Sequence, residues 1–481
     1  MCGEVILLII CSYVHVGKRS DLLSCPSIFI GRGGILGHTN KRSSALSLLP
    51  SLMISMRRQQ KLLLGILGLP FYFLLLYLLY SPTFKSSHST SLLPPLGQSL
   101  RQIGSSANLA IFNVFLDRRL SDNQTEIRSY YGHVNGVLRI ILVKRRGYQP
   151  RLYCLFADGT SVPTRDLHGN PFAFYELTEN HQRLYGGYSV HCDVPPFAQL
   201  MRGVTIRMDS PEYGRIVLPV IHANASKIET LPSQQPSITS TQFEHRFAVC
   251  VPALHHTSNL NTAFLSEWFR VHIRLGVTKF RIYYSERISK NVKDLIMSLK
   301  NRVRIDLYPL FWQENTRAVR QDSWYYLQTM TVNDCLLRSL YDTEYVFFGD
   351  LDEVLIPHSF TISNWNDLVR ELWNDRNVPG ICFPAYKFYG SSVSMSASLL
   401  RSTKIDRIRS KCLVRPNAIF EMGIHHISKP FEEAASMRLK ATHNLTNYAF
   451  IHHYHRLSAR RRAQDIKMDV LDTSVLRFLG K

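Results

Sequence analysis

The sequence predicts an α/β domain with a parallel sheet, preceded by a small β-rich domain and by a single transmembrane helix. Three observations predict this class. Strand-like and helix-like segments alternate from His245 onward, short β-like runs fill residues 107–240, and one uncharged apolar run lies near the N-terminus. A chain of 481 residues also exceeds what one hydrophobic core usually holds, so we expect two folded parts with appendages.

The apolar run Leu62–Tyr80 carries no charge and is close to the ~20 residues that a bilayer core requires. Three positive charges, Arg57, Arg58 and Lys61, come just before it and predict that this end is cytosolic and the rest lumenal, the type II arrangement. A cleaved signal peptide is the alternative, but no small-x-small cleavage site follows Tyr80. We therefore expect a signal anchor at 62–80.

Residues 1–61 are expected to be a cytosolic tail. Within it, Val5–Cys11 is apolar but too short to cross a membrane. If translation starts at Met53 or Met56, residues 1–52 are an extension with little role. After the anchor, residues 81–106 are rich in Ser and Pro and are predicted to form a stem, because such a composition cannot bury enough apolar surface to fold.

Charge and cysteine usage agree with a lumenal chain. Lys and Arg number 57 against 36 Asp and Glu, a formal net charge of +21 that favours anionic partners, but no nucleic-acid-binding motif accompanies it. Asn123, Asn224 and Asn444 begin N-x-Ser/Thr acceptors for glycosylation. Six of the nine cysteines lie in this part, where disulfides are permitted, and Cys154 and Cys192 are the expected pair because they share one strand-rich segment.

The β-rich module at 107–240 is predicted from five runs separated by Gly, Pro, Asn and Asp. The runs are GVLRIILV, RLYCLFA, YSVHCDV, GVTIRM and GRIVLPVIH. They indicate a small β-sandwich. No carboxylate or histidine cluster in this module has catalytic spacing, so we expect a packing, spacer or carbohydrate-contacting role.

From His245 the periodicity changes to alternating strands and helices. In order, the expected elements are a strand FAVCVPAL, a helix TAFLSEWFRVHIRLG, a strand VTKFRIYYSE, a helix NVKDLIMSLKN, a strand VRIDLYPLF, a long helix DSWYYLQTMTVNDCLLRSLYD and a strand EYVFFGDLDEVLIP. Four strands with helical crossovers predict a parallel sheet. Ligands of such sheets bind beyond the carboxyl ends of the strands.

Asp350 and Asp352 occupy that edge on the fourth strand. Because side chains alternate along an extended chain, both aspartates should face the same way while Leu351 turns to the core. Carboxylates are depleted in strands, and a bound divalent cation would offset the cost of placing them there. A loop of solvated carboxylates is the alternative.

Two enzyme classes use such a motif. In one, Mg²⁺ or Mn²⁺ held by the pair neutralises the diphosphate of a sugar nucleotide. In the other, a phosphatase of haloacid-dehalogenase type, Asp350 is the nucleophile and Asp352 the acid/base. The phosphatase needs a second acidic pair, and the nearest, Asp465 and Asp469, lies in an apparent basic helix. A catalytically silent carbohydrate-binding membrane protein is the non-enzyme alternative.

The segment from Cys250 to Arg456 resembles glycosyltransferase family 92. It contains, in the family's order, CVPAL, SEWFRVHIRLGVTKFRIYY, LQTMTVNDCLLRSL, FFGDLDEVLIP, KCLVRP and HHYHR. The resemblance implies a GT-A-like catalytic domain at 245–460, followed by a basic segment at 461–481. It implies an inverting, metal-dependent β-galactosyltransferase of the Golgi that uses UDP-galactose, a glycan acceptor and Mn²⁺ or Mg²⁺.

The resemblance also implies site residues. The metal ligands are expected to be Asp350, Asp352 and His453, the histidine being weighed against a role as a strand cap. Donor contacts are expected from Gln328, Asn333, Asp334 and Asp350. Lys411 and Arg415 are candidates for contacts to phosphate or to an acidic acceptor, with surface charge as the alternative. Where family members often carry an Asp, this chain has Tyr284, Ser285 and Glu286, so the contact to the nucleotide base is not assigned.

An inverting transfer needs a general base, a carboxylate near the acceptor hydroxyl. Glu353, Asp406, Glu421 and Glu432 are the candidates, and the sequence does not choose among them. A metal beside Glu353 would lower its pKa and make it a weaker base. The acceptor and the linkage are likewise not specified by the sequence.

Overall fold

The computed structural model describes most of the chain from residue 100 onward. The described residues are 100–103, 107–120, 136–195, 203–209, 214–221, 243–254, 260–285, 288–311, 319, 321–373, 378–390, 394–431, 445–456 and 468–480. The predicted tail, anchor and stem lie outside them, as do Asn123, Asn224, Asn444 and Glu432. Among the described helices, none has the length and apolar character needed to cross a bilayer.

The predicted parallel sheet is confirmed. Its strands are β10 (His245–Leu254), β11 (Lys279–Tyr284), β12 (Arg304–Pro309) and β13 (Thr343–Phe348). They pair in parallel in the order β12-β11-β10-β13. The chain therefore adds β11 and then β12 on one side of β10 and places β13 on the other side. The switch of direction between β10 and β13 is where open α/β sheets bind ligands. The end of β13 leads directly to Asp350.

The sheet continues beyond β13 with antiparallel and mixed pairings. The added strands are β14 (Glu353–Pro357), β15 (Gly380–Gly390), β16 (Leu400–Val414), β19 (Ala449–Arg456) and β20 (Met468–Leu471). The order β13-β16-β15-β19-β14 extends the sheet, and β20 pairs with β16. Two short strands, β17 (Ile419–Met422) and β18 (Ile427–Pro430), form a separate hairpin. The β20 strand includes Asp469, where the sequence indicated a basic helix.

Helices cover both faces of the parallel strands. On one face, α5 (Thr262–Arg274), α6 (Lys290–Leu299) and α9 (Trp365–Leu372) share a core with the β10 side chains Phe247 and Val249. On the other face, α8 (Gln328–Ser339) packs against the alternate β10 side chains Ala248 and Cys250. The alternation of side chains along β10 thus fills two separate cores. Short 3₁₀ turns lie at Arg118–Leu120, Trp324–Tyr326, Pro416–Ala418, Leu445–Asn447 and Ser474–Phe478.

The long helix predicted before β13 is wrong over its first six residues, 322–327. Tyr325, Tyr326 and Leu327 have φ of 38°, 56° and 66°, so the chain turns through the left-handed region and α8 begins only at Gln328. Non-glycine residues adopt this region at a cost, and the sequence offers no Gly or Pro to mark the break.

In the part of the β-rich module that the structure describes there are nine strands. They are β1 (Arg101–Gln102), β2 (Leu109–Asp117), β3 (Val137–Arg145), β4 (Arg151–Leu155), β5 (Ser161–Pro163), β6 (Tyr175–Glu176), β7 (Tyr185–Asp193), β8 (Gly203–Asp209) and β9 (Gly214–Ile221). Residues of β4, β8 and β9 share one core with residues of β2, β3 and β7. A disulfide between Cys154 and Cys192, the predicted pair, joins β4 to β7 across this core.

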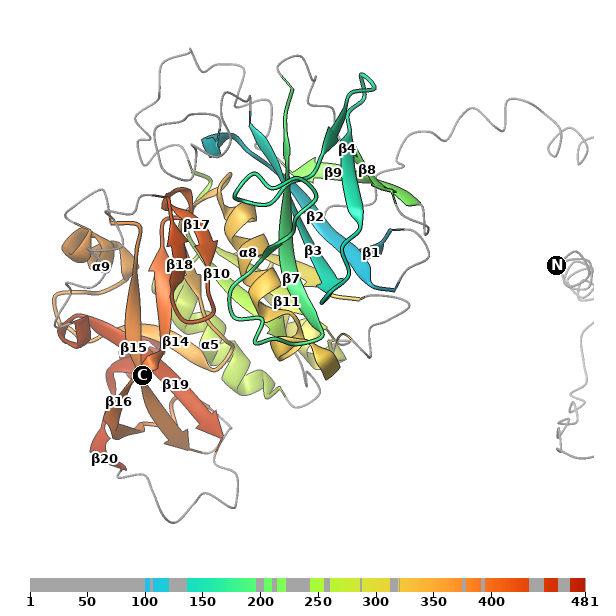
Figure 1. Cartoon of the computed structure of the whole chain (residues 1–481). Coiled ribbons are helices and arrows are strands. Elements are labelled where there is room, and N and C mark those ends of the chain that lie inside the picture. Colours follow the sequence, from blue (N-terminus) through green and yellow to red (C-terminus); the bar gives the residue numbers. More distant parts are fainter. Residues whose placement is uncertain are drawn as a thin grey trace, which may run out of the picture. The chain divides into compact units, whose positions relative to one another are not determined.

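The module packs against α8 through its second face. Every residue of β2 is buried, and Phe112 and Phe115 belong to the core that contains Met330 and Leu337 of α8. In Figure 1, α8 lies between the β2, β3 and β7 strands and the β10 and β11 strands. The β-rich module and the α/β part are therefore joined through one helix that both bury.

Polar contacts reinforce this packing. Asp117 forms ion pairs with Arg119, at 2.7 Å, and with Arg139, at 3.3 Å. Arg119 also donates to the carbonyl oxygens of Pro416 and Ile419, and Arg139 to that of Phe420. The module is thus fixed to the segment that leads into the β17–β18 hairpin.

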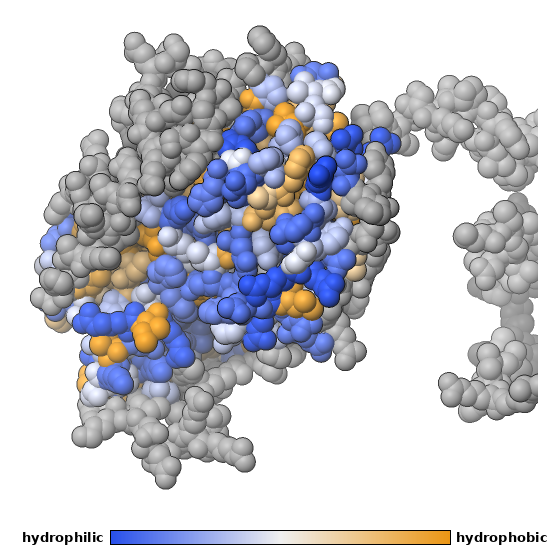
Figure 2. Space-filling model, in the orientation of Figure 1, coloured by the Kyte–Doolittle hydropathy of each residue, from blue (hydrophilic) through white to orange (hydrophobic). Residues whose placement is uncertain are grey.

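The surface has few large apolar side chains. The face seen in Figure 2 is mainly hydrophilic, and its apolar residues form small, separate groups. Among the described residues, Phe360 and Ile408 are the most exposed large apolar side chains, at 94% and 86%. On the face in view, the described residues therefore present no broad apolar surface.

Candidate functional site

The aspartates lie in a turn rather than on a continuous strand. β13 ends at Phe348, β14 begins at Glu353, and Asp350 and Asp352 occupy the turn between them. Leu351 is buried, as expected. The backbone N–H of Glu353 donates to the Asp350 carbonyl at 3.0 Å, and the N–H of Asp350 donates to Oε2 of Glu353 at 3.0 Å. The Glu353 side chain therefore holds the turn that carries both aspartates.

Lys411 of β16 lies between two of these carboxylates. Its Nζ is 3.0 Å from Oδ2 of Asp350 and 3.2 Å from Oε2 of Glu353. The side chains of Lys411 and Glu353 are 2% and 1% exposed, whereas that of Asp350 is 39% exposed. A buried ammonium bonded to two carboxylates is strongly held, because burial removes water as an alternative partner for the ammonium. The surface-charge alternative for Lys411 is thereby excluded.

Burial and charge set the protonation of this group. Burial raises the pKa of Glu353 to about 7, with Asp350 and Asp352 adding to the rise and Lys411 opposing it. Burial alone would also raise the pKa of Asp350, but the Lys411 ammonium outweighs it and lowers that pKa. The two carboxylates raise the pKa of Lys411 despite its burial. Near neutral pH, Asp350 and Lys411 are charged and Glu353 is close to its midpoint.

His453 completes the cluster from β19. It lies opposite Glu353 in the antiparallel pairing of β14 and β19. Its Nε2 is 3.6 Å from Oδ2 of Asp352, and its Nδ1 is 3.7 Å from Oε1 of Glu353. Burial would lower the pKa of His453, but Asp352 and Glu353 outweigh burial and raise it. The structure thus places His453 against Asp352, and Glu353 links His453 to Asp350.

Gln328, a predicted donor contact, lies at the edge of the cluster. As the first residue of α8, it places Nε2 3.5 Å from Oδ1 of Asp350. The left-handed Leu327 just before it sets where the helix starts. The break that shortens the predicted helix therefore also determines the position of Gln328.

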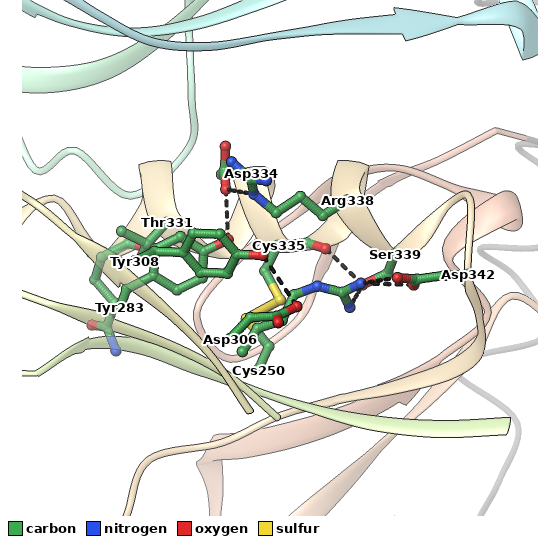
Figure 3. Close-up of a disulfide and its surroundings, with 12 residues drawn as sticks. Cys250, Tyr283, Asp306, Tyr308, Thr331, Asp334, Cys335, Arg338, Ser339 and Asp342 are labelled. Carbon is green, nitrogen blue, oxygen red and sulfur yellow. Dashed lines mark hydrogen bonds and ion pairs between the residues drawn. A yellow bond between two sulfur atoms is a disulfide. The ribbon is translucent and has the colours of Figure 1, made fainter. Parts of the chain in front are cut away.

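Asn333 and Asp334 have different surroundings. Both are completely buried. The Asn333 amide donates to the Met422 carbonyl at 2.9 Å and accepts the Met422 N–H at 3.0 Å, which ties α8 to β17. The Asp334 carboxylate accepts bonds from Asn113, Tyr283 and Arg338, as the close-up in Figure 3 shows for Tyr283 and Arg338. In this structure neither side chain reaches solvent, so the donor contacts predicted for them find no support here.

Arg415 is also separated from the aspartates. β16 runs antiparallel to β13, with Leu413 opposite Phe347 and Val414 opposite Val346. Lys411 therefore lies toward the end of β13, and Arg415 lies toward its start. Four residues of strand span about 13 Å. The predicted phosphate contact by Arg415 at the same site as Lys411 is not supported, since strand direction takes the two apart.

The candidate general bases differ in accessibility. Glu421 is fully buried and accepts bonds from Tyr175 and from the Thr178 N–H of the β-rich module. The Asp406 carboxylate accepts the backbone N–H groups of Ile408 and Arg409. Glu421 is thereby committed to the interior, and Glu353 is as deeply buried, whereas the Asp406 side chain is 20% exposed.

The donor set suits a divalent cation. Asp350 and Asp352 offer hard carboxylate oxygens, and His453 offers an imidazole nitrogen, a combination that Mn²⁺ accepts. Asp352 is 47% exposed and can receive an ion and a ligand from solvent. The Lys411 ammonium occupies one side of Asp350, so an ion would use its other oxygen, the one that faces Gln328. These residues fit a metal that is open to solvent on one side.

The sequence reasoning treated Glu353 only as a candidate base. In the structure it contacts the Asp350 N–H, Lys411 and His453, and so connects all parts of the cluster. Its position directly after the D-x-D motif, at the start of an apolar strand, was the available signal. A carboxylate buried in such a strand requires a partner.

Comparison with known proteins relates the chain to glycosyltransferases. A β-1,4-galactosyltransferase of Caenorhabditis elegans is 25% identical over 291 residues, which are 57% of this chain and 63% of that protein. Two galactan β-1,4-galactosyltransferases of Arabidopsis thaliana are 26% and 24% identical over 233 residues, 46% of this chain and 43% and 42% of theirs. The chain therefore spans less than two thirds of the length of these relatives.

Solved structures add little. S. aureus TarS (residues 1–349) aligns over 46% of this chain and 59% of its own, with 10% identity and a TM-score of 0.23. A 4-diphosphocytidyl-2C-methyl-D-erythritol synthase aligns over 50% of this chain and 100% of its own, with 12% identity and a TM-score of 0.25. Both scores are too low to support an argument. The family model of glycosyltransferase family 92, in contrast, matches residues 245–476, the segment that contains the whole carboxylate cluster. Residues 245–476 of this chain are a glycosyltransferase family 92 domain.

Proposed function

We propose that this chain is a metal-dependent, inverting glycosyltransferase that moves galactose from UDP-galactose onto a glycan in β linkage. The observation that carries the proposal is the cluster of Asp350, Asp352, Glu353, Lys411 and His453 at the carboxyl end of β13, within the segment that matches family 92. Its relatives are named as β-1,4-galactosyltransferases, which supports galactose as the sugar. The same match argues against the phosphatase alternative.

The proposed site resides on a GT-A-like scaffold. Asp350, Asp352 and His453 would hold Mn²⁺ or Mg²⁺, which when bound would neutralise the charge of the leaving diphosphate. Lys411 keeps Asp350 ionised and in place through the 3.0 Å contact. Glu353 fixes the turn through the Asp350 N–H, and Gln328 borders the open side of Asp350.

We further propose a Golgi location with the catalytic part lumenal. The uncharged run at 62–80 with basic residues before it supports a type II anchor. The disulfides between Cys154 and Cys192, and between Cys382 and Cys412, are consistent with an oxidising compartment.

Release of UDP by the full-length chain in detergent tests the activity. The donors are a panel of UDP-sugars, with galactan and N-glycan acceptors, in Mn²⁺ or in EDTA. We expect turnover of UDP-galactose in Mn²⁺ only, and a fall in kcat/KM on the order of 100-fold or more in Asp352→Asn, because that change removes a charge that acts on the transition state.

Asp294→Asn is the matched control. Asp294 is 60% exposed on α6 and pairs with Lys290, which is 87% exposed, so its loss should leave turnover unchanged. Turnover that resists both EDTA and Asp352→Asn would contradict the metal role. Folded protein that turns over no donor with any acceptor would contradict the enzyme and favour the silent carbohydrate-binding protein.

A further inference from the structure

A second cluster of metal-ligand side chains lies apart from the D-x-D turn. His358 follows β14, His452 lies on β19, and Asp472 follows β20. One ligand atom from each lies within 4.8 Å of the other two. Three segments that are distant in the sequence thus direct ligand atoms at one point.

His452 and His453 are neighbours that serve different clusters. Successive side chains of a strand point to opposite faces of the sheet. His453 faces Asp352 and Glu353, whereas Nε2 of His452 lies 3.0 Å from Nε2 of His358. His452 and His453 therefore belong to two different sites and do not both bind at one site.

The two imidazoles are held in position for shared binding. Two Nε2 atoms 3.0 Å apart can carry at most one hydrogen between them, so at least one presents a lone pair to the shared point. The His358 ring stacks on Phe450 at 3.6 Å, and the His452 ring stacks on Phe388 at 4.0 Å. The Nδ1 of His452 contacts the Tyr454 hydroxyl at 3.3 Å, the kind of outer partner that orients a metal-binding histidine.

Oxygen ligands complete the cluster. Oδ2 of Asp472 lies 3.9 Å from Nε2 of His358. The Ser474 hydroxyl lies 3.4 Å from Nε2 of each histidine and donates to Oδ1 of Asp472 at 2.6 Å. Arg401 donates to Oδ2 of Asp472 at 3.0 Å, but a carboxylate has about four lone-pair sites, so this bond leaves one for a metal.

We propose that His358, His452 and Asp472 form a structural zinc site, with the Ser474 hydroxyl or a water as fourth ligand. Two imidazoles, one carboxylate and a fourth oxygen are a tetrahedral set typical of Zn²⁺, whereas Mg²⁺ prefers six oxygens. His452 is completely buried and the His358 side chain is 18% exposed, so the ion enters beside His358.

The site would hold the C-terminal residues 468–480 against the strands of the first cluster. His358 follows the strand that begins with Glu353, and His452 precedes His453. Asp472 and Ser474 come from the segment whose Val475 and Phe478 pack in the core of α5. The zinc ion would thus link residues 468–480 to the two strands that carry Glu353 and His453, on the face opposite the carboxylate cluster. The site stands independently of the proposed transfer reaction.

Metal analysis of the full-length chain in detergent tests this proposal. Asp352→Asn serves as the background, since it weakens metal binding at the first cluster. After incubation with Zn²⁺ and removal of free ion, we expect one equivalent of zinc in this background and less than a tenth of it after adding His358→Gln. His168→Gln, an exposed histidine of the β-rich module, is the control and should keep the zinc. Equal zinc with and without His358→Gln would overturn the proposal.

Two measurements do not depend on a disruptive variant. Co²⁺ bound in place of zinc should give the visible bands of a tetrahedral ion, and EDTA should lower the thermal midpoint of the Asp352→Asn chain. Tyr454→Phe removes only the outer partner of His452 and should weaken Zn²⁺ binding by about 10–100-fold. A folded chain with no zinc, no Co²⁺ bands and no response to EDTA would show that the cluster is only a hydrogen-bonded contact.

Discussion

Lys411 is the residue on which the carboxylate cluster depends most. It is the single cation within contact of both Asp350 and Glu353 among the described residues. Its ammonium lowers the pKa of Asp350 and limits the rise in that of Glu353. Removing one partner of a buried ion pair costs about 3–5 kcal/mol, because it leaves the other charge without a counterion.

We therefore expect Lys411→Met to lower the free energy of unfolding by about 3–5 kcal/mol at pH 8. The loss should be smaller at pH 5.5. Glu353 has a pKa of about 7 in the folded chain, above its ordinary value, so folding disfavours its ionised form. The free-energy cost of burying that ionised form disappears as the pH falls below 7 and Glu353 becomes protonated. Urea denaturation at the two pH values measures the difference.

Lys290→Met is the matched control. Lys290 is 87% exposed in its pair with Asp294, so its loss should give no measurable change at either pH. A Lys411→Met loss that is equal at pH 5.5 and pH 8 would mean that Glu353 does not titrate in this range in the folded chain.

At this scale the residue types of the cluster could be predicted from the sequence, but their partners could not. Asp350, Asp352 and His453 were predicted together from a motif and a resemblance. The motif KCLVRP makes both Lys411 and Arg415 candidates for the site, and only the antiparallel pairing with β13 reveals which one reaches Asp350. Strand partners distant in sequence are set by tertiary packing, which local patterns do not encode.

At the scale of elements, the turn between β13 and β14 is the critical unit. Gly349 opens it, and a Cβ there would lie 2.4 Å from Cε1 and 2.9 Å from Cζ of Phe347. Phe347 is fully buried in the core formed with Trp365. The glycine is therefore required by space rather than by its φ.

We expect Gly349→Ala to destabilise the chain by about 1–3 kcal/mol, since an added methyl in a packed core forces its neighbours to shift. Thermal and urea unfolding measure this loss. Phe347→Leu removes the ring atoms that the methyl would meet, so the double variant should lose less than the sum of the two single losses. Strict additivity would show that the ring is not the obstacle.

Elements with a clear periodicity of apolar residues were predicted well, whereas elements whose ends depend on tertiary contacts were not. The strands β10 to β13 and the helices α5 and α6 follow apolar patterns and turn residues. The start of α8 does not, because aromatic Tyr325 and Tyr326 look helical in sequence while His181 stacks on Trp324 and the β-rich module packs beside them. Tertiary contacts override helix propensity at that point.

At the scale of the whole molecule, the Asp117, Arg119 and Arg139 group joins the β-rich module to the family 92 domain. The Asp117 side chain is fully buried between the two arginines. Burial alone would raise the pKa of Asp117, but Arg119 and Arg139 outweigh it and lower the pKa from 3.8 to about 2. A lowered pKa means that the folded chain favours the ionised carboxylate.

We expect Asp117→Asn to destabilise the whole chain at pH 7, because two arginines lose their counterion. The wild-type carboxylate contributes stability that is complete above about pH 4 and is lost as pH falls to about 2, so the gap between wild type and variant should shrink by about 2 kcal/mol over that interval. Urea denaturation across pH 2–7 follows this gap. Asp209→Asn, at the exposed end of β8, should show no such gap.

The sequence predicted two folded parts but not how they join. Composition and turn residues separate 107–240 from the α/β part. The strand β2, LAIFNVFLD, was not among the predicted runs. The burial of both its faces could not be predicted either, since a mostly apolar strand fits a sandwich core as well as a helix-covered sheet. The resemblance assigned Asn333 and Asp334 to the donor. Their actual partners Met422 and Asn113 are distant in the sequence, and local patterns could not reveal them.

The bonds of Arg119 have a consequence for biosynthesis. Their acceptors, the carbonyls of Pro416, Asn417 and Ile419, come 297, 298 and 300 residues later in the chain. At about 5–20 residues per second, a ribosome needs roughly 15–60 s to supply them after Arg119 has emerged. Until α8 at Gln328–Ser339 has been made, the face of β2 that packs on it is also uncovered and is a surface that chaperones can hold. Contacts of such long range also slow folding, so the native state is reached only after the last third of the chain has been made.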